Sequence, residues 1–133
     1  MDVPDGFVPY EPQGPFLEHI GPIHVREDGQ ELVLGLRAEE RHTNHRGTIQ
    51  GGLLSTFADF ALGRAIEGDA DDDKDRATVS LTVDFLRPAT AGDWIESRTR
   101  VERVGGTLSF ADVSLTVDER EIVRARAVWV VAA

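Results

Sequence analysis

One stretch of periodic apolar residues, running from Leu53 to Gly68, constrains the fold of this chain more than any other feature. Its apolar residues recur at intervals of three, four and seven, which at about 100° per residue places them on one broad helical stripe. They are Leu53, Leu54, Phe57, Ala58, Ala61, Leu62, Ala65 and Ile66. We therefore expect one long helix with a wide buried face.

A polar, glycine-rich loop over residues 42–52 leads directly into this helix. Its three glycines, Gly47, Gly51 and Gly52, allow the backbone to approach a ligand closely. The N–H groups of the first helical turn lack partners within the helix and would point at that ligand. Because such donors favour developing negative charge, the loop and helix together predict a small oxyanion site.

The helix carries a carboxylate, Asp59, roughly opposite the centre of its apolar stripe. Ser55 and Gly63, four residues to either side, and Thr56 beside them are small, so this face has room for something to dock. Spacing alone fits an ordinary amphipathic helix with a solvated aspartate equally well.

The remaining sequence predicts strands. Two, at about 19–27 and 30–38, flank the hairpin signal Asp28-Gly29. Alternating apolar residues from Val79 to Phe85 predict a half-buried strand that ends at Pro88, and further antiparallel strands are expected at about 93–104, 107–117 and 121–131. Residues 1–16 are too proline-rich for a regular element but apolar enough to lie along the domain. We expect one α+β domain over residues 1–133, with the sheet wrapped around the helix.

Composition excludes several functional classes. The net charge is −10, from 14 Lys and Arg against 24 Asp and Glu, which argues against a nucleic-acid partner. No apolar run approaches 18 residues and no secretory signal is present, so we expect no membrane segment. The chain has no cysteine, which fits a reducing compartment, and we expect a cytoplasmic protein.

One pattern in the loop and helix resembles a known family. The pattern is His-x-Asn-x-x-Gly-x-x-(His or Gln)-Gly-Gly, with an aspartate eight residues after the first glycine of the pair. It falls on His42, Asn44, Gly47, Gln50, Gly51, Gly52 and Asp59. It is similar to the hotdog-fold acyl-CoA thioesterases of the phenylacetic-acid-degradation (PaaI) type, and the resemblance continues through residues 78–88 and Gly92-Asp93.

The resemblance implies a hotdog fold, in which a mainly antiparallel sheet of about five or six strands wraps one central helix. It also implies a homodimer at least, with a tetramer left open, whose active site lies between protomers. Asn44 and the Gly51 amide would come from one copy, and Asp59 and Thr78 from its mate. The implied reaction is hydrolysis of an acyl-CoA thioester to a free acid and CoA.

Each residue has an implied role. The Gly51 N–H would bind the thioester oxygen, Asp59 would act as nucleophile or as general base, and Asn44 would orient the water or carbonyl. Thr78 would place a hydroxyl near the water, although a plain strand threonine is an equal interpretation. Gly47, Gln50, Gly52 and Arg87 are substrate-binding candidates. Glutamine at position 50, where many relatives have histidine, cannot transfer a proton near neutral pH.

Coenzyme A carries phosphates, so arginines must gather locally despite the acidic chain. The candidates are Arg46, Arg87, Arg100, Arg103, Arg124 and Arg126. We expect no cofactor, since CoA is part of the substrate, and no metal, since His42 and His45 have no third ligand at zinc-like spacing. The acidic run over residues 69–75 is interpreted as a solvated loop.

Two other functions remain open from the sequence. A hotdog domain can bind acyl-CoA without hydrolysing it, which would make Asp59 dispensable. A hotdog enoyl-CoA hydratase would be expected to pair a histidine with an aspartate, and here Gln50 stands where that histidine would be. The acyl group also stays open, because Phe57, Phe60, Phe85 and Leu86 suit either a pocket or a plain core.

Overall fold

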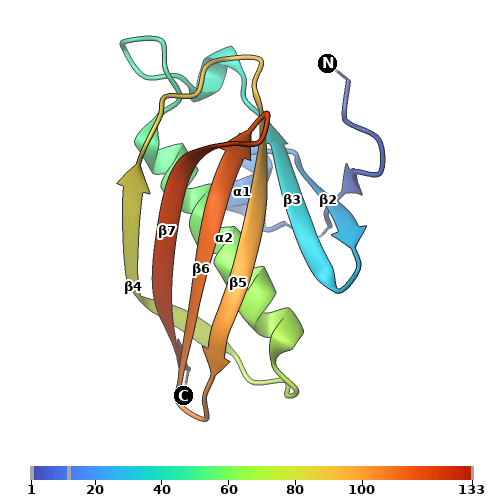
Figure 1. The fold of residues 1–133 in the computed structure, drawn as a ribbon, viewed down its shortest axis with the longest axis vertical. Coiled ribbons are helices and arrows are strands. Elements are labelled where there is room, and N and C mark those ends of the chain that lie inside the picture. Colours follow the sequence, from blue (N-terminus) through green and yellow to red (C-terminus); the bar gives the residue numbers. More distant parts are fainter. Residues whose placement is uncertain (1, 12, 133) are drawn as a thin grey trace.

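A computed structural model describes residues 2–11 and 13–132 as an α+β fold with one long helix against an antiparallel sheet (Figure 1). In chain order the elements are β1 (Val8–Pro9), α1 (Pro15–Ile20), β2 (Ile23–Asp28), β3 (Glu31–Arg37), a 3-10 turn (Glu40–His42), α2 (Gly51–Asp69), β4 (Arg76–Phe85), β5 (Trp94–Val104), β6 (Leu108–Val117) and β7 (Arg120–Val131). The strands of the described residues form one sheet in the order β1-β2-β3-β5-β6-β7-β4.

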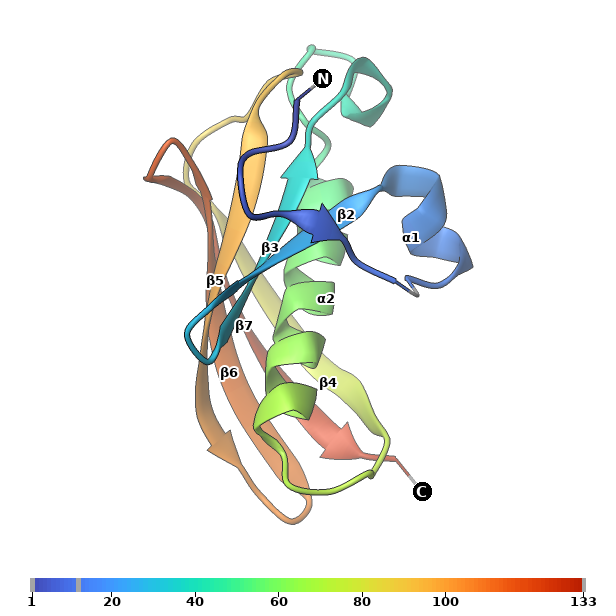
Figure 2. The ribbon, with the colours of Figure 1, turned by 90° about the vertical axis from the view of Figure 1, so that its right-hand side faces the viewer.

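The sheet curves around α2, which lies along its concave face (Figure 2). The helix has the predicted apolar stripe, and Phe57, Leu62 and Ile66 are fully buried in the core. They pack with inward side chains of the central strands, among them Ile95 and Leu115. Burying each such side chain contributes about 1.5–3 kcal/mol, so the stripe fixes the helix against the sheet. None of the helices in the described part of the chain is long and apolar enough to cross a membrane.

The β2–β3 hairpin confirms the signal at Asp28-Gly29. Asp28 pairs with Glu31 across the turn, and Gly29 adopts a positive φ of 67°. The β6–β7 hairpin uses Asp118 and Glu119 at φ values of 49° and 67°. Two consecutive residues with positive φ produce the tight turn that matches the twist of the flanking strands.

The prediction for the N-terminal region was wrong in two places. Residues 1–16 are not wholly irregular, because β1 and the start of α1 lie within them, and β1 brings the sheet to seven strands rather than five or six. The strand expected from residue 19 begins at Ile23, and His19 belongs to α1. Pro15 occupies the first helical position, where its fixed φ and missing N–H are tolerated. Along the sheet, Phe7 is buried, with its ring centroid 5.1 Å from that of Trp94.

A β-bulge interrupts β4 and changes the expected alternation. Thr78 pairs with Trp129 of β7 and Ser80 pairs with Val128, so Val79 is an extra residue without a partner. Residues that pair across two strands point to the same face of the sheet. Trp129 is buried on the face that packs against α2, so Thr78 also points toward the helix. The regular alternation predicted Val79 on the inner face, but its side chain is 59% exposed.

Candidate active site

The carboxylate of Asp59 and the hydroxyl of Thr78 are in direct contact. The Thr78 Oγ1–H donates a 2.7 Å hydrogen bond to Asp59 Oδ1. Asp59 projects from the middle of α2 and is half-buried. The bulge in β4 turns Thr78 toward the helix, so the structure brings these two predicted residues together within one protomer. Their catalytic roles stay predictions.

A cavity of about 210 Å³ lies beside Asp59. Its walls are Phe16 and Leu17 of α1, Trp129 of β7, and a group from α2 that comprises Thr56, Asp59, Phe60, Gly63 and Arg64. The small residues around Asp59 were expected to leave open space beside it. Only part of that space is open, because the Trp129 ring fills the part next to Gly63. A methyl group placed on Gly63 would lie 2.7 Å from the Trp129 ring.

The cavity includes residues that sequence reasoning did not single out. Trp129 and Phe16 come from opposite ends of the chain, and only the strand register and the placement of α1 bring them next to Asp59. Of the aromatic residues considered for an acyl pocket, Phe60 lines this cavity, whereas Phe57 lies in the core.

The N-terminus of α2 presents two free amides. Leu53 and Leu54 both donate their N–H groups to the Gln50 carbonyl. The N–H groups of Gly51 and Gly52 have no hydrogen-bond acceptor among the described residues. Gln50 is exposed and its side chain makes no capping bond. This end of α2 therefore has the donors that an oxyanion site requires.

Phe85 flanks these amides. A methyl group placed on Gly51 would lie 3.2 Å from the tip of the Phe85 ring, and the Phe85 side chain is itself 55% exposed. Leu86 follows it and is also exposed. Phe85 is the last residue of β4 and Leu86 directly follows it, at the end of the strand nearest the start of α2 (Figure 1).

Asn44 organises the loop before α2. Its side-chain oxygen accepts the N–H groups of Arg46 (2.9 Å) and Thr48 (3.2 Å), and its side-chain nitrogen donates to Thr48 Oγ1 (2.9 Å). Gly47 closes the same turn with a φ of 84°. An asparagine that bonds its own loop in this way fixes the loop conformation. The structure therefore shows that Asn44 holds its own loop in position. Its contact with a substrate stays a prediction.

His42 holds the loop to the N-terminal region. Its Nδ1 accepts the N–H of Glu39 at 3.0 Å, so Nε2 carries the proton and donates to the Ile20 carbonyl at 2.7 Å. The residue is buried, and burial lowers its pKa below the ordinary value, against the opposing effect of the Ile20 hydrogen bond. Both ring nitrogens are thus occupied by the fold.

The donors at Gly51 and the carboxylate of Asp59 are too far apart to serve one carbonyl in one protomer. They are eight residues apart on the same helix, and a rise of 1.5 Å per residue separates them by about 12 Å. A reacting atom must lie about 3 Å from both the oxyanion donor and the nucleophile or base. A single copy of the described chain therefore does not assemble the complete predicted site.

Three of the candidate arginines, Arg100, Arg124 and Arg126, line one surface cavity of about 450 Å³ on the outer face of the sheet, and each of them is ion-paired. Arg100, Arg124 and Arg126 form ion pairs with Asp112, Glu121 and Glu102 on exposed positions of the central strands. Arg87 donates to the Glu121 carbonyl at 2.7 Å. Arg46 lies five residues before the start of α2, and Arg87 lies two residues after Phe85, whose ring flanks Gly51.

The acidic run after α2 has a structural contact that charge patterning did not predict. Both carboxylate oxygens of Asp72 accept hydrogen bonds from Arg76, at 2.9 and 3.0 Å. These bonds, with a further one from the Lys74 N–H, lower the pKa of Asp72 to about 2. The pair joins the loop to the start of β4.

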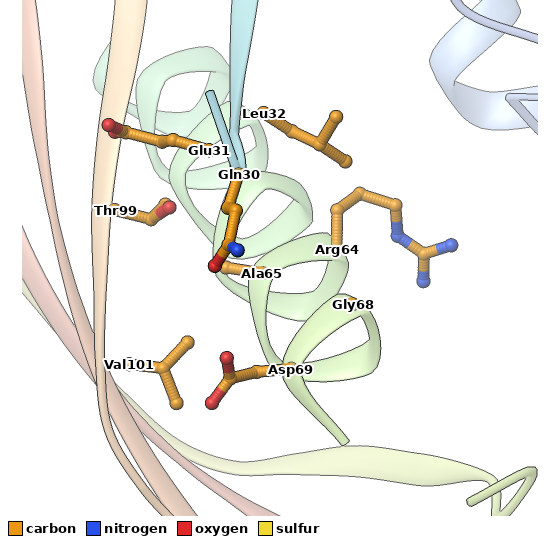
Figure 3. Close-up of a pocket in the computed structure, with 9 residues that line it drawn as sticks. All are labelled: Gln30, Glu31, Leu32, Arg64, Ala65, Gly68, Asp69, Thr99 and Val101. Atoms are coloured by element: carbon orange, nitrogen blue, oxygen red, sulfur yellow. The ribbon is translucent and has the colours of Figure 1, made fainter. Parts of the chain in front are cut away.

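A larger cavity of about 620 Å³ lies at the far end of α2, between that helix and strands β3 and β5. Figure 3 shows Gln30, Thr99, Val101 and Asp69 around it. It contains none of the predicted site residues, so its size does not identify it as the place of the chemistry.

Comparison with known proteins identifies the family. The model of the thioesterase superfamily matches residues 46–123, which include the α2 amides, Asp59 and Thr78. The chain belongs to the thioesterase superfamily. It is therefore a thioester hydrolase, as the loop-and-helix pattern predicted.

Relatives of the thioesterase superfamily match over different lengths. A Pseudomonas aeruginosa protein named as a putative esterase is 42% identical over 97% of both chains. Mouse acyl-coenzyme A thioesterase 13 is 31% identical over 65% of this chain and 61% of its own length.

Solved structures confirm the hotdog fold. The phenylacetic acid degradation-related protein of Ralstonia eutropha superposes with a TM-score of 0.80 at 26% identity, over 91% of this chain and 93% of that one. The PaaI protein of Escherichia coli shares the fold at a TM-score of 0.79 and 20% identity, over 89% of this chain and 84% of that one.

Proposed function

We propose that this thioesterase hydrolyses acyl-CoA thioesters at a site shared by two copies of the chain, with Asp59 as the reacting carboxylate. The observation that carries the proposal is the Thr78–Asp59 hydrogen bond, because it orients a half-buried carboxylate next to a cavity. The name of the mouse relative supports the choice of CoA thioesters.

The free amides of Gly51 and Gly52 support the electrophilic half of the mechanism. Water adds to the thioester carbonyl, the C–S bond breaks, and the products are a carboxylic acid and the CoA thiol. The Gly51 N–H binds the carbonyl oxygen as it gains charge, which is worth about 2.7–4 kcal/mol for a well-aimed donor. Gln50, Gly52 and Gly47 shape the approach to this amide.

Asp59 supplies the nucleophilic half. The Thr78 hydroxyl occupies Oδ1, which leaves Oδ2 to act in one of two ways. It attacks the carbonyl to give a mixed anhydride that water then hydrolyses, or it accepts a proton from the attacking water. In both routes the thiolate leaves and the Thr78 hydroxyl holds the carboxylate in position.

The separation of about 12 Å between Gly51 and Asp59 supports a homodimer in which one copy supplies the amide and the other the carboxylate. Strand β4 is the edge of the described sheet, paired with β7 alone. Its Val79, Phe85 and the following Leu86 are exposed apolar residues. An unpaired apolar edge is a template for pairing with a second strand, so we place the dimer contact along β4.

The test is release of free thiol from a panel of aryl- and alkyl-CoA thioesters by the intact protein, Asp59→Asn and Asp84→Asn. Asp84 lies in the same strand as Thr78 but pairs with Arg124 on the outer face, so its variant is the matched control. We expect at least a hundredfold loss of kcat in Asp59→Asn and full activity in the control.

Two results would contradict the proposal. Equal turnover by Asp59→Asn would remove the carboxylate from the mechanism. Binding of CoA thioesters without turnover by the intact protein, measured by calorimetry, would identify a non-catalytic acyl-CoA-binding protein.

A further inference from the structure

The ring of Phe85 lies against Gly51, whose N–H is one of the two free amides at the start of α2. A methyl group placed on Gly51 would lie 3.2 Å from Cζ and 3.3 Å from Cε1 of that ring, closer than an ordinary van der Waals contact. A methyl group placed on Gly52 would instead meet Gln50 Cγ at an ordinary 3.9 Å. The Phe85 ring therefore occupies the place of a side chain at position 51 and leaves position 52 open.

This contact, and not the backbone, requires glycine at position 51. Gly47 in the preceding loop has a positive φ of 84°, which favours glycine at that position. Gly51 has no such φ and is the first residue of α2, and helices favour alanine over glycine. An alanine would keep the N–H and fit the backbone, but its methyl group would displace the Phe85 ring.

Backbone contacts hold the ring and the amide next to each other. Phe85 pairs with the fully buried Val123 of β7 at the end of β4. Four residues after Phe85, the Ala89 carbonyl accepts the Ile49 N–H at 2.8 Å, just before the start of α2. Phe85 is nevertheless 55% exposed, so its ring adds little to the core of a single copy. The tip of the ring meets the first residue of α2 instead.

The ring gives the two free amides different surroundings. Gly51 is half-buried, whereas Gly52 is exposed. A hydrogen bond is electrostatically stronger where the surroundings are less polar than water. A donor next to an aromatic ring therefore stabilises a developing oxyanion more than a donor surrounded by water does. This difference favours Gly51 over Gly52 as the donor.

We propose that Phe85 is a positioning residue of the oxyanion site: its ring takes the place of a side chain at position 51, holds the first turn of α2 in position and forms an apolar wall beside the Gly51 N–H. The inference rests on the proposed function, because it assumes that this amide binds the thioester oxygen. Both residues belong to the same copy, so their contact does not depend on the second chain.

The first test is a double-mutant cycle of Gly51→Ala and Phe85→Ala, read as kcat and KM for a CoA thioester. Each single variant should lower kcat about tenfold and change KM less, because the N–H is retained and only its aim and surroundings are altered. In the Phe85→Ala background, Gly51→Ala should change kcat by less than about twofold, since its methyl group then enters vacated space. Additive losses would overturn the proposal.

Two control variants make changes of the same kind elsewhere. Gly68→Ala adds a methyl group to the same helix, where the described part of the chain leaves open space around it. Leu108→Ala removes an exposed apolar side chain from β6. Both should keep the kcat of the intact protein. Analytical ultracentrifugation of every variant identifies any loss of the dimer. Phe85→Leu, which keeps apolar bulk at the edge of β4, replaces Phe85→Ala in the cycle if the dimer is lost.

A second readout needs no turnover. Exchange of the Gly51 amide proton with water, measured by NMR on the protein without substrate, should become at least about threefold faster in Phe85→Ala, while exchange at Gly52 stays the same. Unchanged exchange at Gly51 would overturn the positioning role even if CoA thioesters are hydrolysed. Faster exchange in a protein that hydrolyses none of them would overturn only the proposed hydrolysis.

Discussion

Thr78 donates a 2.7 Å hydrogen bond to Asp59, nineteen residues away in the chain. The bond joins an edge strand to the middle of the central helix and positions the carboxylate beside its cavity. The hydroxyl and the carboxylate come from the same copy, so the bond forms before any second chain arrives. We therefore treat Thr78 as a positioning residue for Asp59.

Replacing Thr78 with valine should lower kcat by about ten- to a hundredfold, because a hydrogen bond to a charged group contributes about 1.5–3 kcal/mol. Thr78→Ser keeps the hydroxyl and should retain most of the activity. Steady-state thiol release on both variants makes the comparison, with circular dichroism to confirm folding. Equal rates for serine and valine would show that the hydroxyl does not position the carboxylate.

A charge at Val79 should separate the proposed dimer. Val79→Lys introduces a cation on the exposed edge of β4, and charged residues at an edge prevent strand pairing. We expect a folded monomer without activity, detected by analytical ultracentrifugation. Leu108→Lys is the control, since Leu108 is also an exposed apolar residue but lies on β6. A dimer that survives Val79→Lys would place the contact elsewhere.

Removing Arg46 should weaken binding of the CoA phosphates. The arginine is exposed in the loop before α2 and has no ion-pair partner in the described part of the chain. Arg46→Ala and Arg87→Ala should each raise KM for a CoA ester about three- to tenfold, while kcat stays similar. Arg100→Ala, which breaks only a pair with Asp112, should change neither constant.

A thioester of N-acetylcysteamine lacks the CoA phosphates, so it tests whether the rise in KM comes from lost phosphate binding. Its KM should be the same in the Arg46→Ala variant and in the intact protein. A rise of similar size with both esters would mean that Arg46 shapes the loop instead of binding phosphate.

Burial of His42 should make stability fall on mild acidification. Burial lowers its pKa in the folded protein below the ordinary value of 6.5, so the unfolded chain binds the proton first as the pH falls. The stabilisation is present above about pH 6.5 and is lost below it. Melting temperatures measured from pH 7.5 to 5 should drop more in the intact protein than in His42→Gln, and identical slopes would contradict this role.

Periodicity predicted the long elements because a buried stripe repeats many times within each of them. The helix expected from about Leu53 to Gly68 runs from Gly51 to Asp69, and the last three strands begin and end within about a residue of their expected limits. The six-residue α1 has too few repeats for such a pattern. Its available signal was Gly14-Pro15, a helix start that the density of nearby prolines obscured.

The site was harder to predict than the fold because its contacts depend on register. The loop pattern pointed to Asp59, Asn44 and the glycines without indicating that Asn44 would bond its own turn. Nothing near Trp129 in the sequence indicates that it reaches Gly63 from β7. Arg100 and Arg126 likewise form pairs with residues on other strands, Asp112 and Glu102, which no local pattern reveals.

The extra residue in β4 means that the direction of the Thr78 side chain depends on the register of the strand as well as on the type of residue. If the same residues formed a strand without the bulge, strict alternation from Leu81 would put Val79 on the inner face and turn Thr78 to the outer face, while every side chain of the site kept its identity. A homologue could carry the whole motif and still lack the orientation. A threonine aligned with Thr78 therefore takes the same direction only where the strand register around it is also the same.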